Sequence, residues 1–373
     1  MAEVAREVIC LFGLPFGVVT MGQTVRLVRE AVHTRQPLFL SKPNLNFLIA
    51  CQHDAAFRQP VLDSDLSVAD GMTLVWMARW LGVPLPERVT GSGLFERLRD
   101  EVPPPGQSPI KVYFFGGPPG AAEAASLSLN ADVRGMVCVG FETPGFGSVA
   151  DVSTPDVLQR INASGADFLV VALGAVKGQD WIQHNRAQLS VPVISHLGAV
   201  VNFAAGKVSR APVWVQKSGL EWLWRIKEEP KLWLRYWGDA KALVTLALGQ
   251  LLPHARWLQI QSAPAPAALS LLPDGQWHRL ILQGAVFDPM PAAMLITLRQ
   301  AATVATPLLL DLTQATGFGP GFAGQLLLQK AMMLKNKPLK ITRLSPLMKR
   351  LFGWNGLTTM ILLSEGCQAT NAS

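Results

Sequence analysis

The chain has 373 residues, of which 49% are hydrophobic and 16% charged, so it can bury a large core and is not a disordered chain. Its formal net charge of +7 favours anionic partners such as nucleic acid, anionic lipid or phosphorylated ligands. The four cysteines have no CxxC spacing, which indicates reduced thiols. There is no basic secretory leader, and no apolar run reaches the roughly 18 residues of a spanning helix. We therefore expect a cytoplasmic protein.

Apolar runs alternate with helical patterns through the first half of the chain. This alternation predicts an α/β fold, with a parallel sheet covered by helices on both faces. The runs expected to form its strands are 37–41, 66–69, 111–117, 135–141, 167–174 and 191–200.

The pattern changes near residue 207. Consecutive helical segments follow, then a Pro/Ala-rich linker, then a small α/β unit with three strands and three helices. We expect a core at 1–206, a helical appendage at 207–260, a linker at 261–269 and a second domain at 270–373.

Asp70 follows the apolar run Leu66–Ala69 and precedes Gly71. Ligands of open α/β sheets bind at the carboxyl ends of the strands, where a carboxylate can act as a general base. The same residue could instead cap the helix that follows it. The Asp63–Asp65 segment has the form of a metal-binding DxD, but it precedes its strand and so lies at the wrong end of the sheet. No histidine has metal-ligand spacing, and we expect no metal and no cofactor.

Two further strand ends carry residues suited to a phosphorylated sugar. Gly116 and Gly117 form a turn before an Ala-rich helix, whose N-terminus would favour a phosphate. Lys177 could meet a phosphate, and Gln179 a sugar hydroxyl. A plain turn would explain either segment equally well, since neither matches a known phosphate-loop spacing.

Six of the eleven tryptophans fall between residues 214 and 257, in a basic context. Lys231 and Arg235 lie four residues apart, as do Trp233 and Trp237, so each pair shares a helix face. Trp with Lys or Arg is typical of an interfacial helix on a membrane. A Trp-rich core helix with a solvated basic face is the alternative. The basic residues do not alternate with aromatic residues on strands, which disfavours a nucleic-acid partner.

The motifs together resemble those of the bacterial WecG/TagA/CpsF glycosyltransferase family, over about residues 8–240. The most specific is the last, in which "RAP" is followed by "GLEW", an Arg, "EP" and "RY". The motifs are KPNLNFL (42–48), VADGMTLVW (68–76), ERVTGSGLF (87–95), VYFFGGPPG (112–120), VALGAVKGQDWI (171–182) and the run 196–237.

The resemblance implies a Rossmann-like core and an inverting transfer of a sugar from a UDP-sugar to a polyprenyl-diphosphate-linked saccharide. It implies that the protein is peripheral on the cytoplasmic face of the inner membrane and needs no metal. Asp70 matches the family's proposed general base. The family motifs place substrate-binding residues at Asn44, Thr90, Gly116, Gly117, Lys177, Gln179 and Asn202. The basic residues expected at the acceptor diphosphate and the membrane are Arg210, Arg225, Lys231 and Arg235.

Some positions depart from the family pattern. Lys42 stands where the family commonly has Thr, Asn202 where it has Asp, and Gly93 where it has Asp. The run Val176–Gln179 replaces Pro-Lys-Gln-Glu. These variants are closest to an exopolysaccharide branch of the family.

The last hundred residues resemble a STAS domain. The segment 321–324 reads GFAG, and Phe322 and Ala323 provide no hydroxyl where that family carries a phosphorylatable Ser or Thr. We expect docking to a protein partner rather than a phosphate switch.

The prediction is therefore a membrane-associated glycosyltransferase of exopolysaccharide synthesis with an appended STAS-like domain. One rival is a catalytically degenerate scaffold, which Lys42 favours and Asp70 disfavours. A second rival, a nucleotide-binding oxidoreductase, lacks the GxGxxG motif.

Overall fold

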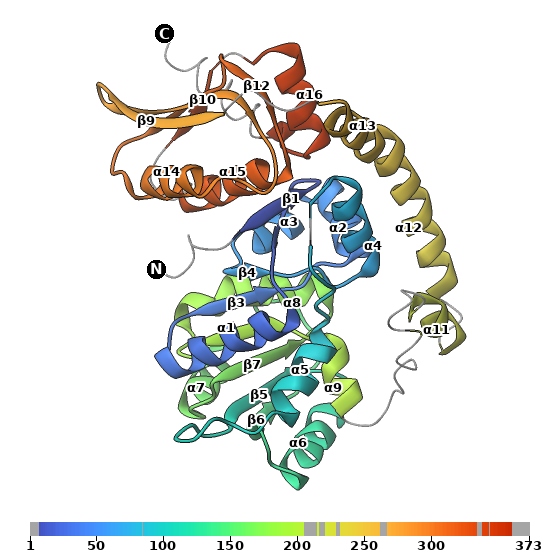
Figure 1. The fold of residues 1–373 in the computed structure, drawn as a ribbon. Coiled ribbons are helices and arrows are strands. Elements are labelled where there is room, and N and C mark those ends of the chain that lie inside the picture. The colour runs from blue at the N-terminus through green and yellow to red at the C-terminus, as the bar shows by residue number, and fades with distance from the viewer. Residues whose placement is uncertain are drawn as a thin grey trace.

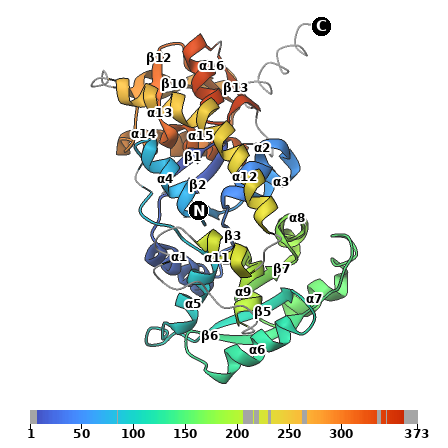
Figure 2. The same cartoon turned by 90° about the vertical axis from the view of Figure 1, so that its right-hand side faces the viewer.

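The computed structural model describes residues 7–83, 85–204, 215, 221–228, 232–261, 267–333, 338–342 and 344–359. A parallel sheet with its helices forms one end of the molecule, and a smaller α/β unit forms the other end (Figure 1). A short β-hairpin lies between them, and a long helical segment runs along one side from the core to the smaller unit (Figures 1 and 2).

The core sheet has six strands, in the order β4-β3-β8-β7-β5-β6, and every pairing is parallel. Apolar residues fill the strands, as expected for a sheet that is buried on both faces. This confirms the α/β parallel-sheet prediction and fits a Rossmann-like core. The strands are β3 (Leu38–Ser41), β4 (Leu66–Ser67), β5 (Ile110–Gly116), β6 (Met136–Glu142), β7 (Phe168–Ala172) and β8 (Val193–His196).

Two layers of helices cover this sheet. One hydrophobic cluster joins the sheet to α1 (Met21–Thr34), α5 (Gly91–Asp100), α6 (Ala121–Ala131) and α9 (Gly198–Ala204). A second cluster joins the opposite face to α7 (Pro155–Ala163) and α8 (Ala175–Asn185), which continues into a 3-10 turn at Arg186–Gln188. Strand residues alternate between the two clusters: Val170 packs in the first, and Leu169 and Val171 in the second.

A third cluster lies beyond the β4 edge. It contains α2 (Leu45–His53), α3 (Ala55–Leu62), α4 (Met72–Trp80) and an antiparallel hairpin of β1 (Val8–Leu11) and β2 (Leu14–Gly17). This hairpin was not predicted from the sequence. Its two apolar strands are joined by Phe12-Gly13, and both residues have positive φ, as a two-residue hairpin turn requires.

The described part of the appendage is helical, as predicted. Its described elements include α11 (Glu221–Glu228), α12 (Leu232–Leu246), a π-helical turn (Ala247–Leu251) and α13 (Leu252–Ile260). Asn46 of α2 donates a hydrogen bond to Asp239 of α12 (3.1 Å), so one side of α12 is fixed to the core. Within the described residues, no helix combines the length and the apolar character that crossing a membrane requires.

In the described residues of the C-terminal unit, five strands form one sheet. β9 (Ala268–Asp274) pairs antiparallel with β10 (Trp277–Val286), which also pairs parallel with β11 (Leu308–Asp311) and β12 (Ala315–Phe318). β13 (Leu339–Ile341) pairs with β11. Its helices are α14 (Ala292–Thr303), α15 (Pro320–Met333) and α16 (Pro346–Trp354). The three expected strands and three helices are present, while β9 and β12 were not foreseen and β9 begins two residues before the expected boundary.

The C-terminal unit packs directly on the hairpin. Cys10 of β1 donates its thiol hydrogen to the carbonyl oxygen of Asn355 (3.1 Å) and belongs to the core cluster of the C-terminal unit. A Cβ added at Gly324 of α15 would lie 2.4 Å from the carbonyl oxygen of Val8, so glycine permits this helix to touch the strand. The two parts of the chain therefore share a close-packed interface.

Candidate active site

The candidate site lies where the carboxyl ends of β3, β4 and β8 meet. β3 has β4 on one side and β8 on the other. The carboxyl ends of the strands are the usual ligand position in open α/β sheets. Lys42 follows β3, Asp70 follows β4, and Leu197 follows β8.

Asp70 does not cap the helix that follows it. The N-cap of α4 is Gly71, and no described side chain caps that helix. The Asp70 carboxylate instead accepts hydrogen bonds at Oδ2 from Lys42 Nζ (3.3 Å) and from the backbone N–H of Gly91 (3.5 Å). Its own backbone N–H donates to Pro43 O (3.0 Å), which fixes it beside the chain that leaves β3. The capping alternative is therefore wrong, and the carboxylate is left available for chemistry.

Lys42 reaches Asp70 across the first residue of α5. A Cβ added at Gly91 would lie 2.5 Å from Lys42 Cε and 2.7 Å from Leu197 Cδ2, so a larger residue there would force these side chains to move. The side chains of Lys42 and Asp70 are each 19% exposed. The ion pair is thus partly buried, and solvent screens it less than a surface pair.

Polar side chains are buried near this pair, at or just after the carboxyl ends of β3, β4 and β8 and in α8. Gln179 of α8 donates from Nε2 to Ser41 Oγ (3.3 Å). Ser67 Oγ, Gln179 Oε1 and His196 Nε2 are buried and have no hydrogen-bond partner in the described part of the chain. Buried polar atoms are almost always paired, so these three atoms are expected to bind ordered water.

His196 is neutral in this environment. Burial, aided by the charge of Lys42, lowers its pKa from 6.5 to about 3. A Cβ added at Gly178 would lie 2.4 Å from His196 Cδ2, so this glycine of α8 is needed to seat the imidazole. The ring can therefore donate or accept a hydrogen bond at Nε2 without carrying a charge.

The turn after β5 has the geometry that its glycines predict. Gly116 and Gly117 have φ of 97° and 94°, and a Cβ at Gly116 would meet Ala172 O at 2.8 Å. The N-cap of α6 is Gly120, and no described side chain caps this helix. Its first turn therefore keeps backbone N–H groups that can bind an anion.

Other expected site residues have structural contacts of their own. The Asn44 side chain accepts from the N–H of Phe47 and caps α2, and the Thr90 side chain accepts from Gly93 and caps α5. Lys177 lies in the first turn of α8, and Gln179 is buried within that helix rather than in a surface turn. Arg210 and Lys231 lie outside the described residues, as do the side chains of Asn202, Arg225 and Arg235.

The acidic pair upstream of β4 is structural. Asp63 accepts hydrogen bonds from Gln59 and Gln183, and Asp65 accepts from the N–H of Phe39 at the start of β3 (2.6 Å). Both carboxylates lie at the end of the sheet opposite Asp70. Among the described residues, no group of three potential ligands could hold a metal ion.

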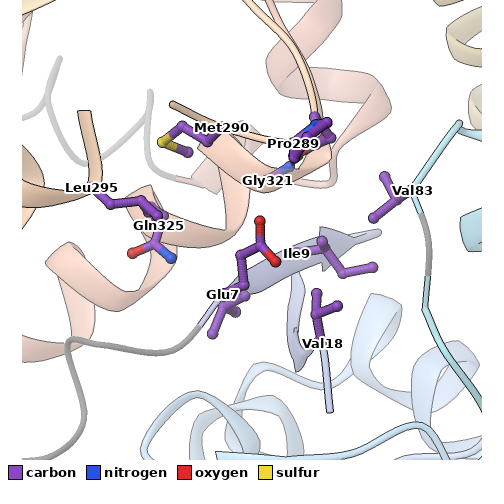
Figure 3. A pocket seen from close by; sticks show the side chains of 11 residues that line it. Glu7, Ile9, Val18, Val83, Pro289, Met290, Leu295, Gly321 and Gln325 are labelled. Atoms are coloured by element: carbon purple, nitrogen blue, oxygen red, sulfur yellow. Dashed lines mark hydrogen bonds between the residues drawn. The ribbon is translucent and has the colours of Figure 1, made fainter. Parts of the chain in front are cut away.

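A separate cavity of about 40 Å³ lies between the hairpin and the C-terminal unit (Figure 3). The carboxylates of Glu7 and Asp288 line it, together with apolar side chains of both parts. Burial raises the pKa of Asp288 to about 6, and its carboxylate accepts a hydrogen bond from the N–H of Gly321 (3.0 Å). The cavity has room for a water molecule, not for a sugar nucleotide.

Comparison with known proteins identifies the family. The family model described as "Glycosyl transferase WecG/TagA/CpsF family" matches residues 9–256, which is more than half of the chain. The chain belongs to this family. It is 29% identical over 178 residues to an N-acetylglucosaminyldiphosphoundecaprenol N-acetyl-beta-D-mannosaminyltransferase of Bacillus spizizenii. The match spans 48% of this chain and 66% of that relative.

The match to the WecG/TagA/CpsF family begins within the hairpin and ends in α13, so it includes the core and the described helical appendage. The C-terminal α/β unit lies outside it. Asp70 and Gln179 were predicted site residues, whereas Lys42 was predicted only as a departure from the family pattern and His196 had no predicted role. The sequence did contain a signal for Lys42 and His196. Lys42 directly follows one apolar strand and His196 ends another, and both therefore lie at the carboxyl ends of the strands.

Proposed function

We propose that the protein is an inverting glycosyltransferase that moves a sugar from a UDP-sugar to a polyprenyl-diphosphate-linked saccharide in exopolysaccharide synthesis. The observation that carries this proposal is the position of Asp70. Its carboxylate lies at the carboxyl ends of the strands, is partly exposed, and is anchored through one oxygen only among the described contacts. Membership of the glycosyltransferase family supports the reaction class.

The reaction is a single displacement. Asp70 takes the proton of the acceptor hydroxyl as that oxygen forms a bond to C1 of the donor sugar. The bond between C1 and the diphosphate oxygen breaks, and UDP leaves with the electron pair. General-base catalysis by a positioned carboxylate contributes about 10²- to 10⁴-fold to such a step.

The other site residues are assigned to substrate binding. The N-terminal turn of α6 after Gly116 and Gly117, together with Lys177 in the first turn of α8, would bind the diphosphate, because N–H groups and helix dipoles favour anions there. The unpaired atoms of Gln179 and His196 suit sugar hydroxyls. We expect no metal or other cofactor.

The helical appendage supplies a surface for the membrane. Trp233 is 53% exposed and Trp237 56%, so neither is a core residue. Exposed apolar side chains continue along α12 and the following turns at spacings of four and seven, through Val244, Leu248 and Leu252. Lys241 lies over the ring of Trp237 (5.6 Å) and adds a positive charge. Such a stripe suits peripheral binding to an anionic bilayer, on the cytoplasmic face where the lipid-linked acceptor is extended.

The C-terminal unit is proposed to be a STAS-like domain with a docking role. Its central strand β10, flanked by parallel and antiparallel neighbours and packed on α15, supports an α/β domain of this kind. The rival function is that of a catalytically degenerate scaffold. The observation that favours this rival is the ion pair between Asp70 and Lys42.

The test is UDP release from a panel of UDP-sugars, with and without a polyprenyl-diphosphate-linked sugar acceptor. The wild-type chain is compared with Asp70→Asn and with the matched control Asp132→Asn, which removes an exposed carboxylate. We expect acceptor-dependent release from the wild type and the control, and a loss of about 10²- to 10⁴-fold in Asp70→Asn with UDP binding retained. Release that Asp70→Asn leaves intact would refute the base assignment, and no release with any donor would favour the scaffold.

A further inference from the structure

The two oxygens of the Asp70 carboxylate have different surroundings. Oδ2 accepts from Lys42 Nζ (3.3 Å) and from the N–H of Gly91 (3.5 Å), while Oδ1 has no hydrogen bond from any described residue. A carboxylate bound through one oxygen cannot rotate freely about its terminal bond. The contacts therefore leave one oxygen of a fixed carboxylate available for an incoming hydroxyl.

The stronger of these two contacts comes from a side chain that is itself held in place. A Cβ added at Gly91 would lie 2.5 Å from Lys42 Cε and 2.6 Å from Lys42 Cδ, so the stem of Lys42 packs closely against the first residue of α5. Fixing a free lysine costs side-chain rotamer entropy, and here the packing of the stem already restricts the rotamers of Lys42. The ammonium group is thus pre-positioned at Oδ2.

We infer that Lys42 is a positioning residue, which holds Oδ2 of Asp70 so that Oδ1 faces the acceptor hydroxyl. This inference rests on the proposed role of Asp70 as the base. Lys42 acts through Asp70 and takes no proton itself. The positioning of a catalytic group is worth a large share of a rate enhancement, and a misplacement of about 1 Å can cost about 10²-fold.

The experiment is a double-variant cycle on acceptor-dependent UDP release by the full chain. Lys42→Met keeps most of the apolar stem and removes the ammonium, and Lys349→Met is the matched control on an exposed lysine of α16. We expect Lys42→Met to lower kcat by about 10- to 100-fold with little change in KM for the donor. Lys42→Arg should recover part of this loss, because it restores a cation.

The decisive measurement is Lys42→Met in the Asp70→Asn background. If Lys42 acts through Asp70, the double variant has the kcat of Asp70→Asn alone. A merely structural role would instead lower kcat by the same factor in both backgrounds, and that result would overturn the inference. Unchanged or increased kcat in Lys42→Met alone would also overturn it, since the lysine would then be dispensable or inhibitory.

Gly91→Ala tests the geometry without altering either charged group. The added Cβ must displace the Lys42 stem, so this variant should reproduce the kcat loss of Lys42→Met, and wild-type kcat would count against the inference. The outcomes also separate this inference from the proposed function. Full activity in Asp70→Asn would refute both the base role of Asp70 and the positioning role of Lys42. Loss of activity in Asp70→Asn with full activity in Lys42→Met would refute only the positioning role of Lys42.

Discussion

The contact between Gly324 and the hairpin gives a direct test of how the two parts of the chain are joined. Gly324 lies in α15, and a Cβ there would be 2.4 Å from Val8 O, 2.7 Å from the carbonyl carbon of Ile9 and 2.8 Å from its Cα. All three are backbone atoms of a strand whose residues are buried. An alanine has no alternative rotamer, so Gly324→Ala must move the helix or the strand.

The cost can be estimated from a matched pair of variants. Gly353 of α16 is also a helical glycine of the C-terminal unit, but a Cβ there would meet nothing within 4 Å. Both substitutions gain about 1 kcal/mol of helix propensity, which cancels in the comparison. Overpacking a close-packed contact costs about 1–3 kcal/mol. We therefore expect Gly324→Ala to be less stable than Gly353→Ala by about 1–3 kcal/mol.

Urea unfolding followed by tryptophan fluorescence measures this difference, because Trp257 and Trp354 pack against the C-terminal core. The stability difference is read from the transition midpoints at equal slopes. Equal midpoints for the two variants would show that α15 does not press against β1, and would refute the shared interface described above.

Two further predictions concern pH and the membrane. Burial lowers the pKa of His254 from 6.5 to about 4, so the folded protein favours the neutral ring. The free energy of unfolding is therefore unaffected by this residue above pH 6.5 and decreases as the pH falls from 6.5 toward 4. His254→Gln should therefore lose less stability than wild type between pH 7 and 5, by a difference of about 2 kcal/mol in urea titrations, and identical pH dependence would contradict this. Trp233→Ser with Trp237→Ser should weaken binding to anionic vesicles by more than about tenfold in sedimentation assays, while Phe146→Ser, on an exposed side chain of the core, should not. Equal binding by all of these variants would exclude the stripe as the membrane contact.

The core sheet was predictable because its signal is local. Each strand is an apolar run bounded by polar or glycine residues, and each is followed by a helical pattern, so chain order alone implies parallel pairing. The same reasoning placed Asp70 at the correct end of the sheet, and it predicted the helices of the appendage and of the C-terminal unit.

The hairpin and the ion pair could not be predicted in the same way. β1 is buried by α15, more than 300 residues away in sequence, so no local pattern shows why its residues are all apolar. The contact of Lys42 with Asp70 depends on Gly91, which is in a third segment. A motif comparison records Lys42 only as a departure, whereas the geometry shows what the lysine touches.

The hairpin has a consequence for the order in which the protein can be completed during synthesis. Cys10 and Asn355 are joined by a hydrogen bond although they are separated by 345 positions. A ribosome adds roughly 5–20 residues per second, so α15 and α16 are synthesised roughly tens of seconds after β1. During that interval its apolar edge is open to other nascent chains and to chaperones. A chain that stops before α15 would keep this edge of β1 uncovered.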